Sequence, residues 1–240
     1  MSTRLATVRR LDARPLDDPR YRLILSVDLE GSTLQTNPVK GELRRVMYDL
    51  LAQALRGAGV GPRHLEQLTD RGDGVLVLVR PHDDVPKTLL LGRVVPILTA
   101  LLAEHNAEVG DPALRLRLRV VVHAGEVHDD GKGFYGDDLD VAFRLLDAPA
   151  VKRALRQAPT SPLVLVVSEE IFTGTVRHGY IDDGPYQQRV QVRVGERRRY
   201  GRVNVPGPAV VDRPVSIRRA KTLSLPAPLS GPEGRRLARG

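Results

Sequence analysis

The chain has 240 residues, of which 41% are hydrophobic, 4% are aromatic and none is Trp. This length is enough for one sizeable domain, whose core has to be built from Leu, Val and Ala. Cysteine is absent, which excludes disulfides, cysteine-ligated zinc and a thiol nucleophile and fits a reducing compartment.

Membrane and export signals are not apparent in the sequence. No run of about 18 apolar residues is present to span a bilayer. The first 20 residues are polar and charged, without the apolar stretch of a signal peptide. We therefore expect a cytoplasmic protein that does not associate with a membrane.

Positive charge is concentrated at the C-terminal end. The formal net charge is +8, and from residue 206 onward seven Lys and Arg residues face one Asp and one Glu, so this tail carries +5. The tail also holds six of the 18 prolines and lacks periodicity, which predicts a disordered, solvated segment. We therefore divide the chain into an extension (1–20), one domain (21–205) and a basic tail (206–240), and we do not expect nucleic acid as a partner.

The first half of the domain predicts a strand, a helix and a hairpin. Residues 21–27 form a short apolar run that ends at Asp28, as a buried strand would. Residues 42–55 place their apolar side chains at helical spacing, and two glycines follow. The segments 64–68 and 75–79 flank the sequence Arg-Gly-Asp-Gly, which indicates a strand–turn–strand hairpin.

The second half continues with a long helix and further strands. Residues 85–109 predict a helix kinked by Pro96. The expected elements that follow are a strand (114–122), a helix with Asp138 as a candidate cap (137–146), a strand (163–167), a short helix capped by Ser168, and two late strands (187–194 and 202–205). We expect the arginine run 197–199 to lie in a solvated hairpin or loop.

This order of elements predicts an α+β sandwich. Helices would cover one face of a mixed sheet, with the split βαβ, ferredoxin-like arrangement as the natural candidate.

Two aspartates are the strongest candidates for chemistry. Asp28 ends a buried strand and precedes Gly-Ser-Thr, whose backbone amides can face phosphate oxygens. Asp73 lies between glycines in the expected hairpin turn. If the two strands are neighbours, both carboxylates meet at one sheet edge, where a divalent cation would relieve their repulsion. Each motif alone is also compatible with an ordinary turn acid.

The histidines and Ser168 do not indicate a second chemistry. His123 lies in an apolar strand and is expected to be a satisfied core residue. The six histidines show no zinc-type spacing. No nucleophile-elbow sequence surrounds Ser168.

Five motifs in order resemble the catalytic domain of class III nucleotidyl (adenylyl and guanylyl) cyclases. VDLEGST (27–33) and RGDGVLVLV (71–79) resemble the two metal-binding motifs of bacterial members. VVVHAGEV (120–127) looks like the strand before the dimerisation arm, FYGDDLDVAFRL (134–145) is similar to the helix with the transition-state residues, and LVVS (165–168) looks like the next strand. The resemblance covers residues 21–205.

The resemblance implies roles for individual residues. Asp28 and Asp73, with the backbone of Leu29, would hold two Mg²⁺ or Mn²⁺ ions per site. Arg144 falls at the catalytic arginine, and Arg193 is the candidate for the last catalytic cation. The expected nucleotide-binding residues are Gly31, Ser32, Thr33, Thr69 and Gly72. The sites would form between two subunits of a homodimer, which would convert a nucleoside triphosphate to a 3′,5′-cyclic nucleotide and pyrophosphate.

Two positions depart from the family pattern. Asp140 replaces the usual Asn that orients the ribose, which adds a charge and removes amide donors. Thr69 replaces the base-reading Lys or Glu. The base therefore stays open, and a pyrimidine, as in bacterial antiphage cyclases, is among the possibilities.

Two alternatives to an active cyclase remain from the sequence. One is a catalytically degenerate, cyclase-like nucleotide-binding module that regulates a partner, as Asp140 and Thr69 suggest. The other is a basic-tailed nucleic-acid-binding protein.

Overall fold

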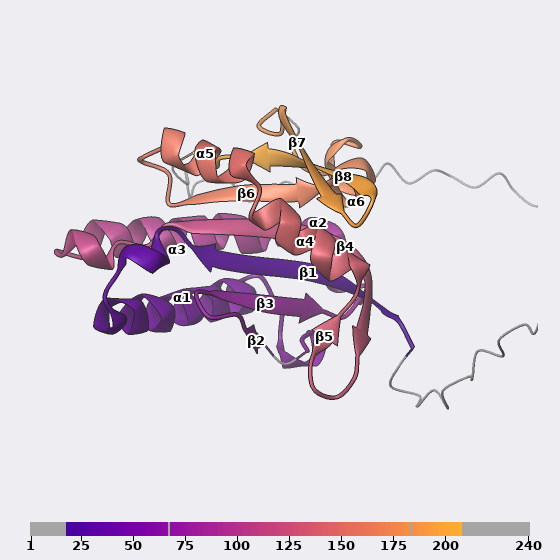
Figure 1. Ribbon diagram of the computed structural model, residues 1–240, viewed down its shortest axis with the longest axis horizontal. Helices are drawn as coiled ribbons and strands as arrows, with labels where there is room; N and C mark the ends of the chain where they lie inside the picture. The colour runs from indigo at the N-terminus through magenta and orange to yellow at the C-terminus, as the bar shows by residue number, and fades with distance from the viewer. Residues whose placement is uncertain (1–17, 67, 183, 208–240) are drawn as a thin grey trace, which may run out of the picture.

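A computed structural model describes residues 18–66, 68–182 and 184–207 (Figure 1). They form an eight-stranded sheet in the order β2-β3-β1-β4-β6-β8-β7, with β5 paired to β4. The strands are β1 (Arg20–Leu29), β2 (Thr69–Asp70), β3 (Gly74–Val79), β4 (Leu118–Asp129), β5 (Phe134–Tyr135), β6 (Leu163–Ser168), β7 (Gln188–Val194) and β8 (Arg197–Asn204). The helices are α1 (Asn37–Gly57), α2 (Lys87–Leu89), α3 (Val95–Glu108), α4 (Asp137–Leu146), α5 (Pro149–Gln157) and α6 (Glu169–Ile171).

Short helical turns complete the set. They are the 3₁₀ turns η1 (Ser32–Leu34), η2 (Pro62–His64) and η4 (Pro112–Leu114) and the π-turns η3 (Leu90–Val94) and η5 (Phe172–Val176). The helix expected over 85–109 is divided into α2, the π-helical η3 and α3, with Pro96 in the first turn of α3.

The ferredoxin-like arrangement is confirmed. β1 pairs antiparallel with both β3 and β4, and β2 pairs antiparallel with β3, so the βαββαβ unit has the strand order expected for a split βαβ. β6 then adds parallel to β4, and β8 and β7 follow as an antiparallel hairpin.

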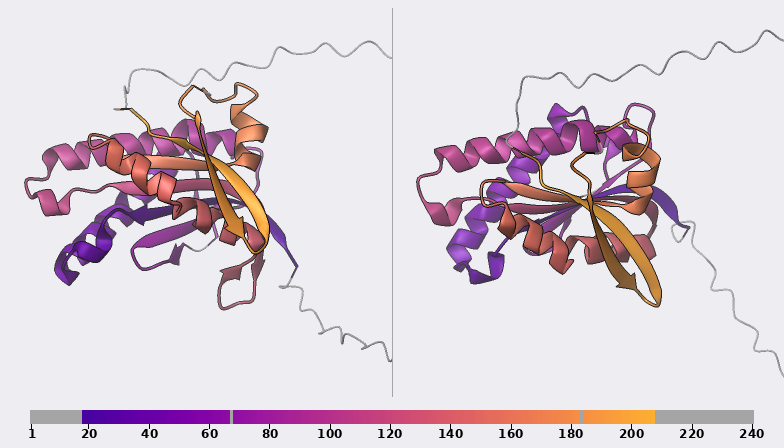
Figure 2. Two further views of the ribbon diagram at one scale, coloured as in Figure 1. Left: turned by 45° about the horizontal axis from the view of Figure 1, so that its top comes forward. Right: turned by 90° about the horizontal axis from the view of Figure 1, so that it is seen from above.

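The expectation that helices cover only one face of the sheet is wrong. α1 and α3 pack on one face, and α4 and α5 pack on the other (Figure 2). β3 explains why, since all six of its residues are buried. Its valines, at 75, 77 and 79, join the core under α1 and α3, while Leu76 and Leu78 join the core under α4 and α5. A strand buried on both faces requires helices on both.

Several elements differ from the sequence expectation. The strand expected from residue 114 starts at Leu118, because the Asn106 side chain binds both backbone groups of Leu116, at 2.7 Å each, in place of a strand partner. The first hairpin strand shrinks to β2 plus an isolated bridge from Leu65 to Val79. Helix α5 was not expected at all, and the tail 208–240 lies outside the described residues.

One described stretch, Lys87–Glu108, is long and apolar enough to cross a membrane by length and composition. Its buried side chains pack against the sheet, as those of a core helix do: Leu90, Leu91, Val94, Val95, Leu98 and Leu102.

The Glu66 side chain connects Arg80, which follows β3, with Arg22 on the central strand β1. Its carboxylate accepts hydrogen bonds from Arg80 (2.8 and 2.9 Å) and from Arg22 on β1 (2.7 and 3.1 Å). These bonds, with that of Arg80 the stronger, lower the pKa of Glu66 from 4.5 to about 2.

We predict that Glu66→Gln lowers the free energy of unfolding by about 1–3 kcal/mol at neutral pH. Because the folded pKa lies below the unfolded one, this stabilisation is complete above the unfolded pKa of about 4.5 and is lost as the pH falls towards about 2. Urea denaturation of both proteins at several pH values measures the difference. Glu42→Gln, at an exposed pair with Arg45, is the control, and an equal effect of both changes would contradict the prediction.

Candidate active site

Backbone pairing brings Asp28 and Asp73 to the same end of the sheet. Asp28 lies opposite Gly74 in the β1–β3 register, and the Leu29 N–H donates to the Asp73 carbonyl at 3.0 Å. The two aspartates are therefore held side by side by the ladder itself, as their positions in the sequence suggested.

Both aspartates line one cavity of about 320 Å³. The loop after β1 forms one wall, and the end of α4 with the start of α5 forms the opposite wall. Of the expected nucleotide-binding residues, Gly31, Ser32 and Thr33 line it. The other polar or charged lining side chains are Ser26, Arg71, Arg119, Asp147 and Lys152.

The carboxylate of Asp28 is partly buried, in an environment where a nearby positive charge is favourable. Arg119 lies opposite it in the β1–β4 register and forms an ion pair with its Oδ2. Its Oδ1 is buried and, among the described residues, has no hydrogen-bond partner. Burial raises the pKa of Asp28, the Arg119 charge opposes this, and the Asp73 charge adds to the rise. A positive charge beside Oδ1 would relieve both the burial and the repulsion.

Asp73 is positioned by small residues. The Ser32 hydroxyl donates a hydrogen bond to its Oδ2. Gly72 and Gly31 adopt left-handed φ values of 80° and 71°, which allow the tight turns on either side of the carboxylate. Gly74 brings β3 close to β1, since a Cβ there would lie 2.5 Å from the Val27 carbonyl oxygen.

Two further nucleotide-binding candidates lie outside the main cavity. Gly72 lines a neighbouring cavity of about 230 Å³ with Lys40 and Arg44. Thr69 pairs with Leu76 in the hairpin and lines neither cavity.

The residues expected on α4 point away from the cavity of their own chain. Asp140 and Arg144 are exposed one helical turn apart, whereas Phe143 and Leu146 line the cavity. Arg193, on β7, is also exposed and does not line it. One chain therefore brings together the aspartates and the Gly-Ser-Thr loop, but not the three expected catalytic residues.

Asp138 does not cap α4, contrary to the sequence expectation. The N-cap is Gly136, without a side-chain bond. Asp138 instead accepts the Glu126 N–H at 2.6 Å and contacts His123 Nε2 at 3.3 Å. His123 is confirmed as a core residue, since it is 1% exposed and bonds Ser168 at 2.7 Å, and Ser168 is confirmed as the cap of α6.

Several solved cyclase structures have a similar fold. The adenylate/guanylate cyclase/hydrolase from Silicibacter pomeroyi is 18% identical, with a TM-score of 0.55 over 79% of this chain and 98% of that chain. The guanylyl cyclase Cya2 is 17% identical, with a TM-score of 0.54 over 80% and 96%. The chain has the class III nucleotidyl cyclase fold. The adenylyl cyclase CyaB from P. aeruginosa, 13% identical, has a TM-score of 0.52 over 80% and 98%.

No protein-family model matches the sequence, and no curated protein matches it significantly. At these identities the likeness to solved cyclases establishes the fold.

Sequence reasoning missed three cations in the cavity of this cyclase fold. Arg119 pairs with Asp28, Lys152 lies 3.0 Å from Asp147, and Arg71 stacks over the Phe143 ring at 3.3 Å from its centroid. The alternation of Leu and Arg at 114–119 indicated that Arg119 shares one face of a strand with Arg115 and Arg117. Lys152 was missed because α5 was not expected, although its apolar residues recur at helical spacing.

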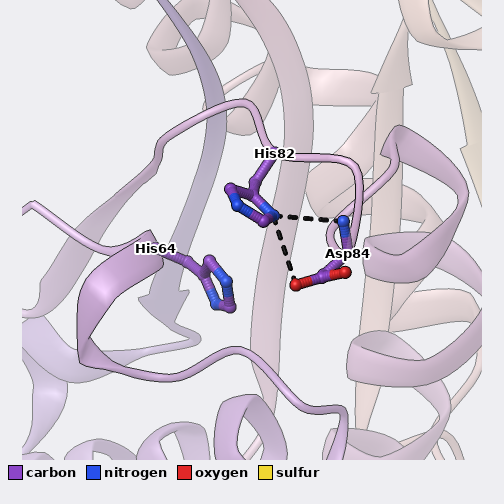
Figure 3. Close-up of side chains that lie close together, drawn as sticks. All are labelled: His64, His82 and Asp84. Carbon is purple, nitrogen blue, oxygen red and sulfur yellow. Dashed lines mark hydrogen bonds and ion pairs between the residues drawn. The ribbon is translucent and has the colours of Figure 1, made fainter.

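A second cluster, His64, His82 and Asp84, lies at the opposite end of β3 (Figure 3). Its potential ligand atoms lie within 4.8 Å of one another. Backbone N–H groups already donate to Nδ1 of both histidines, each at 3.2 Å. Arg63 contacts His64 Nε2 at 2.9 Å and the Asp84 carboxylate at 2.7 Å. A guanidinium thus already neutralises the cluster, which we interpret as an ion-pair network.

We predict that Gly74→Ala destabilises the protein by about 1–3 kcal/mol, because the added Cβ overpacks the β1–β3 contact. Separation of the strands should also weaken Mn²⁺ binding at Asp28 and Asp73. Chemical denaturation and titration calorimetry measure the two effects. Gly41→Ala is the control, since a Cβ there has no atom within 4 Å and lies in α1, where Ala is favoured by about 0.5–1 kcal/mol. Unchanged stability of the Gly74 variant would contradict the prediction.

Proposed function

We propose that this protein is a nucleotidyl cyclase that converts a nucleoside triphosphate to a 3′,5′-cyclic nucleotide and pyrophosphate. One observation carries the proposal: Asp28 and Asp73 line a single cavity together with the Gly31–Ser32–Thr33 loop. The cyclase fold supports it, and so do the cationic side chains of Arg71, Arg119 and Lys152 in the cavity lining.

The residues of the cavity fit Mg²⁺ or Mn²⁺. Both prefer carboxylate and carbonyl oxygens, and the buried Oδ1 of Asp28 lacks a partner among the described residues. Asp28 and Asp73, with the adjoining Leu29 backbone, would hold two ions. When bound, they would lower the pKa of the ribose 3′-hydroxyl and stabilise charge on the attacking and leaving oxygens.

The chain's own cations would bind the triphosphate. Arg119 and Lys152 are paired with Asp28 and Asp147 across the cavity, and phosphate oxygens would offer both cations stronger, charge-assisted hydrogen bonds. The backbone of the loop after β1 would hold the phosphates in place. Arg71, fixed by its stacking on Phe143, would narrow the entrance and orient the substrate.

The remaining catalytic residues would come from a second copy. Asp140 and Arg144 are exposed and turned away from their own cavity, so we propose a homodimer in which α4 of one subunit completes the site of the other. Arg144 would neutralise charge developing on the α-phosphate, and Asp140 would accept a hydrogen bond from a ribose hydroxyl. Arg193 would act in the same way, from the partner.

The base remains open in this proposal. Thr69 lies outside the main cavity and offers no charged group to select adenine or guanine, so pyrimidine triphosphates belong among the candidate substrates. We propose a cytoplasmic enzyme, where all four triphosphates are available.

The second candidate function is a nucleotide-binding regulatory module without turnover. Asp140 favours it, because an exposed carboxylate at the ribose position would repel the triphosphate. Metal-dependent triphosphate binding without product, together with gain of product in Asp140→Asn, would select this candidate.

The purified protein with Mn²⁺ should form cyclic nucleotide and pyrophosphate from at least one of ATP, GTP, CTP and UTP, as measured by chromatography. Asp28→Asn and Asp73→Asn should each lower the rate by at least about 100-fold, because each removes a metal-binding carboxylate. Asp83→Asn, an exposed acid in the loop after β3, is the control. No product from a folded wild-type dimer with any of the four substrates would refute the enzyme proposal.

Shared sites predict complementation between inactive variants. Asp73→Asn and Arg144→Ala should each be inactive alone. After subunit exchange at equal concentrations, half of the dimers are mixed and each has one intact site, so about a quarter of wild-type activity should return. Continued inactivity, despite exchange verified by native mass spectrometry, would mean that Asp73 and Arg144 of the same subunit act together, and would contradict the shared site.

A further inference from the structure

The β7–β8 hairpin is a ribbon with two different faces. The register pairs Arg189 with Arg202 and Arg193 with Arg198, so these four side chains lie on one face with Tyr200 between them. The other face carries the β7 valines, at 190, 192 and 194, which pack in the core beneath α4. Because that core fixes the inner face, the four arginines are held outward. We call them the arginine face.

The arginine face has no ion-pair partner in the part of the chain that the structure describes. Among the residues that the structure describes, no acid lies within ion-pair distance of any of its four members. Arg189, Arg193 and Arg198 are exposed, and Arg202 is partly covered by Phe172, 4.3 Å from its ring centroid. In contrast, arginines elsewhere in the domain, such as Arg22, Arg63 and Arg119, each pair with a carboxylate.

Charge is strongly segregated along the chain. Residues 188–240 contain 13 Lys and Arg and three acids, a net charge of +10, whereas residues 1–187 carry −2. Half of that +10 lies in the ribbon, which has six arginines and only Glu196 as an acid. The basic character that the sequence seemed to confine to the tail is thus shared by a rigid, folded surface. Such a surface is the electrostatic footprint of a polyanion-binding site.

The chemistry of the ribbon favours nucleic acid over a lipid surface. All six of its cations are arginines, whose planar fork binds phosphate through two hydrogen bonds and stacks on flat rings. Arg189 stacks over Tyr200 at 3.8 Å, so the face also presents a flat aromatic and guanidinium surface. The ribbon's valines face inward, and no large apolar side chain of the ribbon is exposed for insertion into a bilayer.

We propose that the arginine face of the β7–β8 ribbon binds nucleic acid through its phosphodiester backbone. The two cross-strand pairs are four residues apart along the ribbon, about 13 Å, so they contact two separate, non-adjacent phosphates along the strand. Recognition is independent of sequence, because backbone phosphates carry no base information. The proposal does not depend on nucleotide turnover.

The test is fluorescence anisotropy of the full chain with short labelled single-stranded RNA and duplex DNA, over about 50 to 200 mM salt. The wild type should bind at least one probe, with an affinity that falls as salt rises. Arg189→Gln/Arg198→Gln, which leaves the proposed catalytic Arg193 in place, should weaken binding about tenfold and lower the log–log salt slope by about 1.5, since each lost phosphate contact removes about 0.7–0.9. Arg56→Gln/Arg153→Gln removes the same charge from exposed helix positions and should change little.

Four results would overturn the proposal. Equal weakening by both double variants would assign binding to overall charge. No weakening by either double variant would assign binding to the tail. Displacement of the probe by excess ATP at constant ionic strength would assign the arginines to a nucleotide site. Binding to phosphatidylserine vesicles without binding to either nucleic acid would identify a lipid surface.

Discussion

The pairing of β1 with β3 on one side and β4 on the other is the constraint on which the site depends. It places Asp28 between Gly74 and Arg119, so that the same residue faces a close backbone and a guanidinium. Gly74 makes the close approach possible, because any side chain there would meet the Val27 carbonyl. The next ladder bond, from Leu29 to the Asp73 carbonyl, holds the second aspartate beside the first. The geometry of the two aspartates is thus set by backbone hydrogen bonds, which are stiffer than side-chain contacts.

Burial of charge gives this arrangement its chemical character. Asp28 has one oxygen paired with Arg119 and one buried without a partner, and a carboxylate in that state is costly unless a cation arrives. Around it, Asp73 and Asp147 share the cavity with Arg71, Arg119 and Lys152, so acids and bases nearly balance inside. Among the described residues, by contrast, Arg189, Arg193, Arg198 and Arg202 on the β7–β8 ribbon have no ion-pair partner. Arginine is thus paired with an acid in the cavity, as at Arg119, and unpaired on one face of this ribbon.

The sequence predicted the parts of the fold that depend on local pattern and chain order. The apolar run before Asp28, the helix at 137–146 and the ferredoxin-like topology could all be read from periodicity. Features that depend on tertiary partners could not. Asn106 delays the start of β4. Helix α5, by contrast, has a regular amphipathic pattern, with Val151, Ala154 and Leu155 buried on one face, and sequence reasoning missed it although the pattern is local. The presence of helices on both faces follows from the full burial of β3. A run of valines and leucines alone does not distinguish a strand covered on both faces by helices from a strand in the core of a sandwich.

For the site, sequence reasoning located the acids but not their partners. Asp28, Asp73 and the Gly-Ser-Thr loop were found because glycines and acids at strand ends can be recognised from neighbouring positions in the sequence. Arg119 and Lys152 became apparent only when the sheet register and α5 were known. The central claim is that Asp28 and Asp73 together hold divalent cations. Diffraction data collected at the manganese edge, from crystals grown with Mn²⁺ and a non-hydrolysable nucleoside triphosphate analogue, test it most directly. The account predicts anomalous density in contact with the carboxylates of both Asp28 and Asp73. Anomalous density only at other positions would contradict it. So would a complex with bound nucleotide and no metal, in which Arg119 is still paired with Asp28.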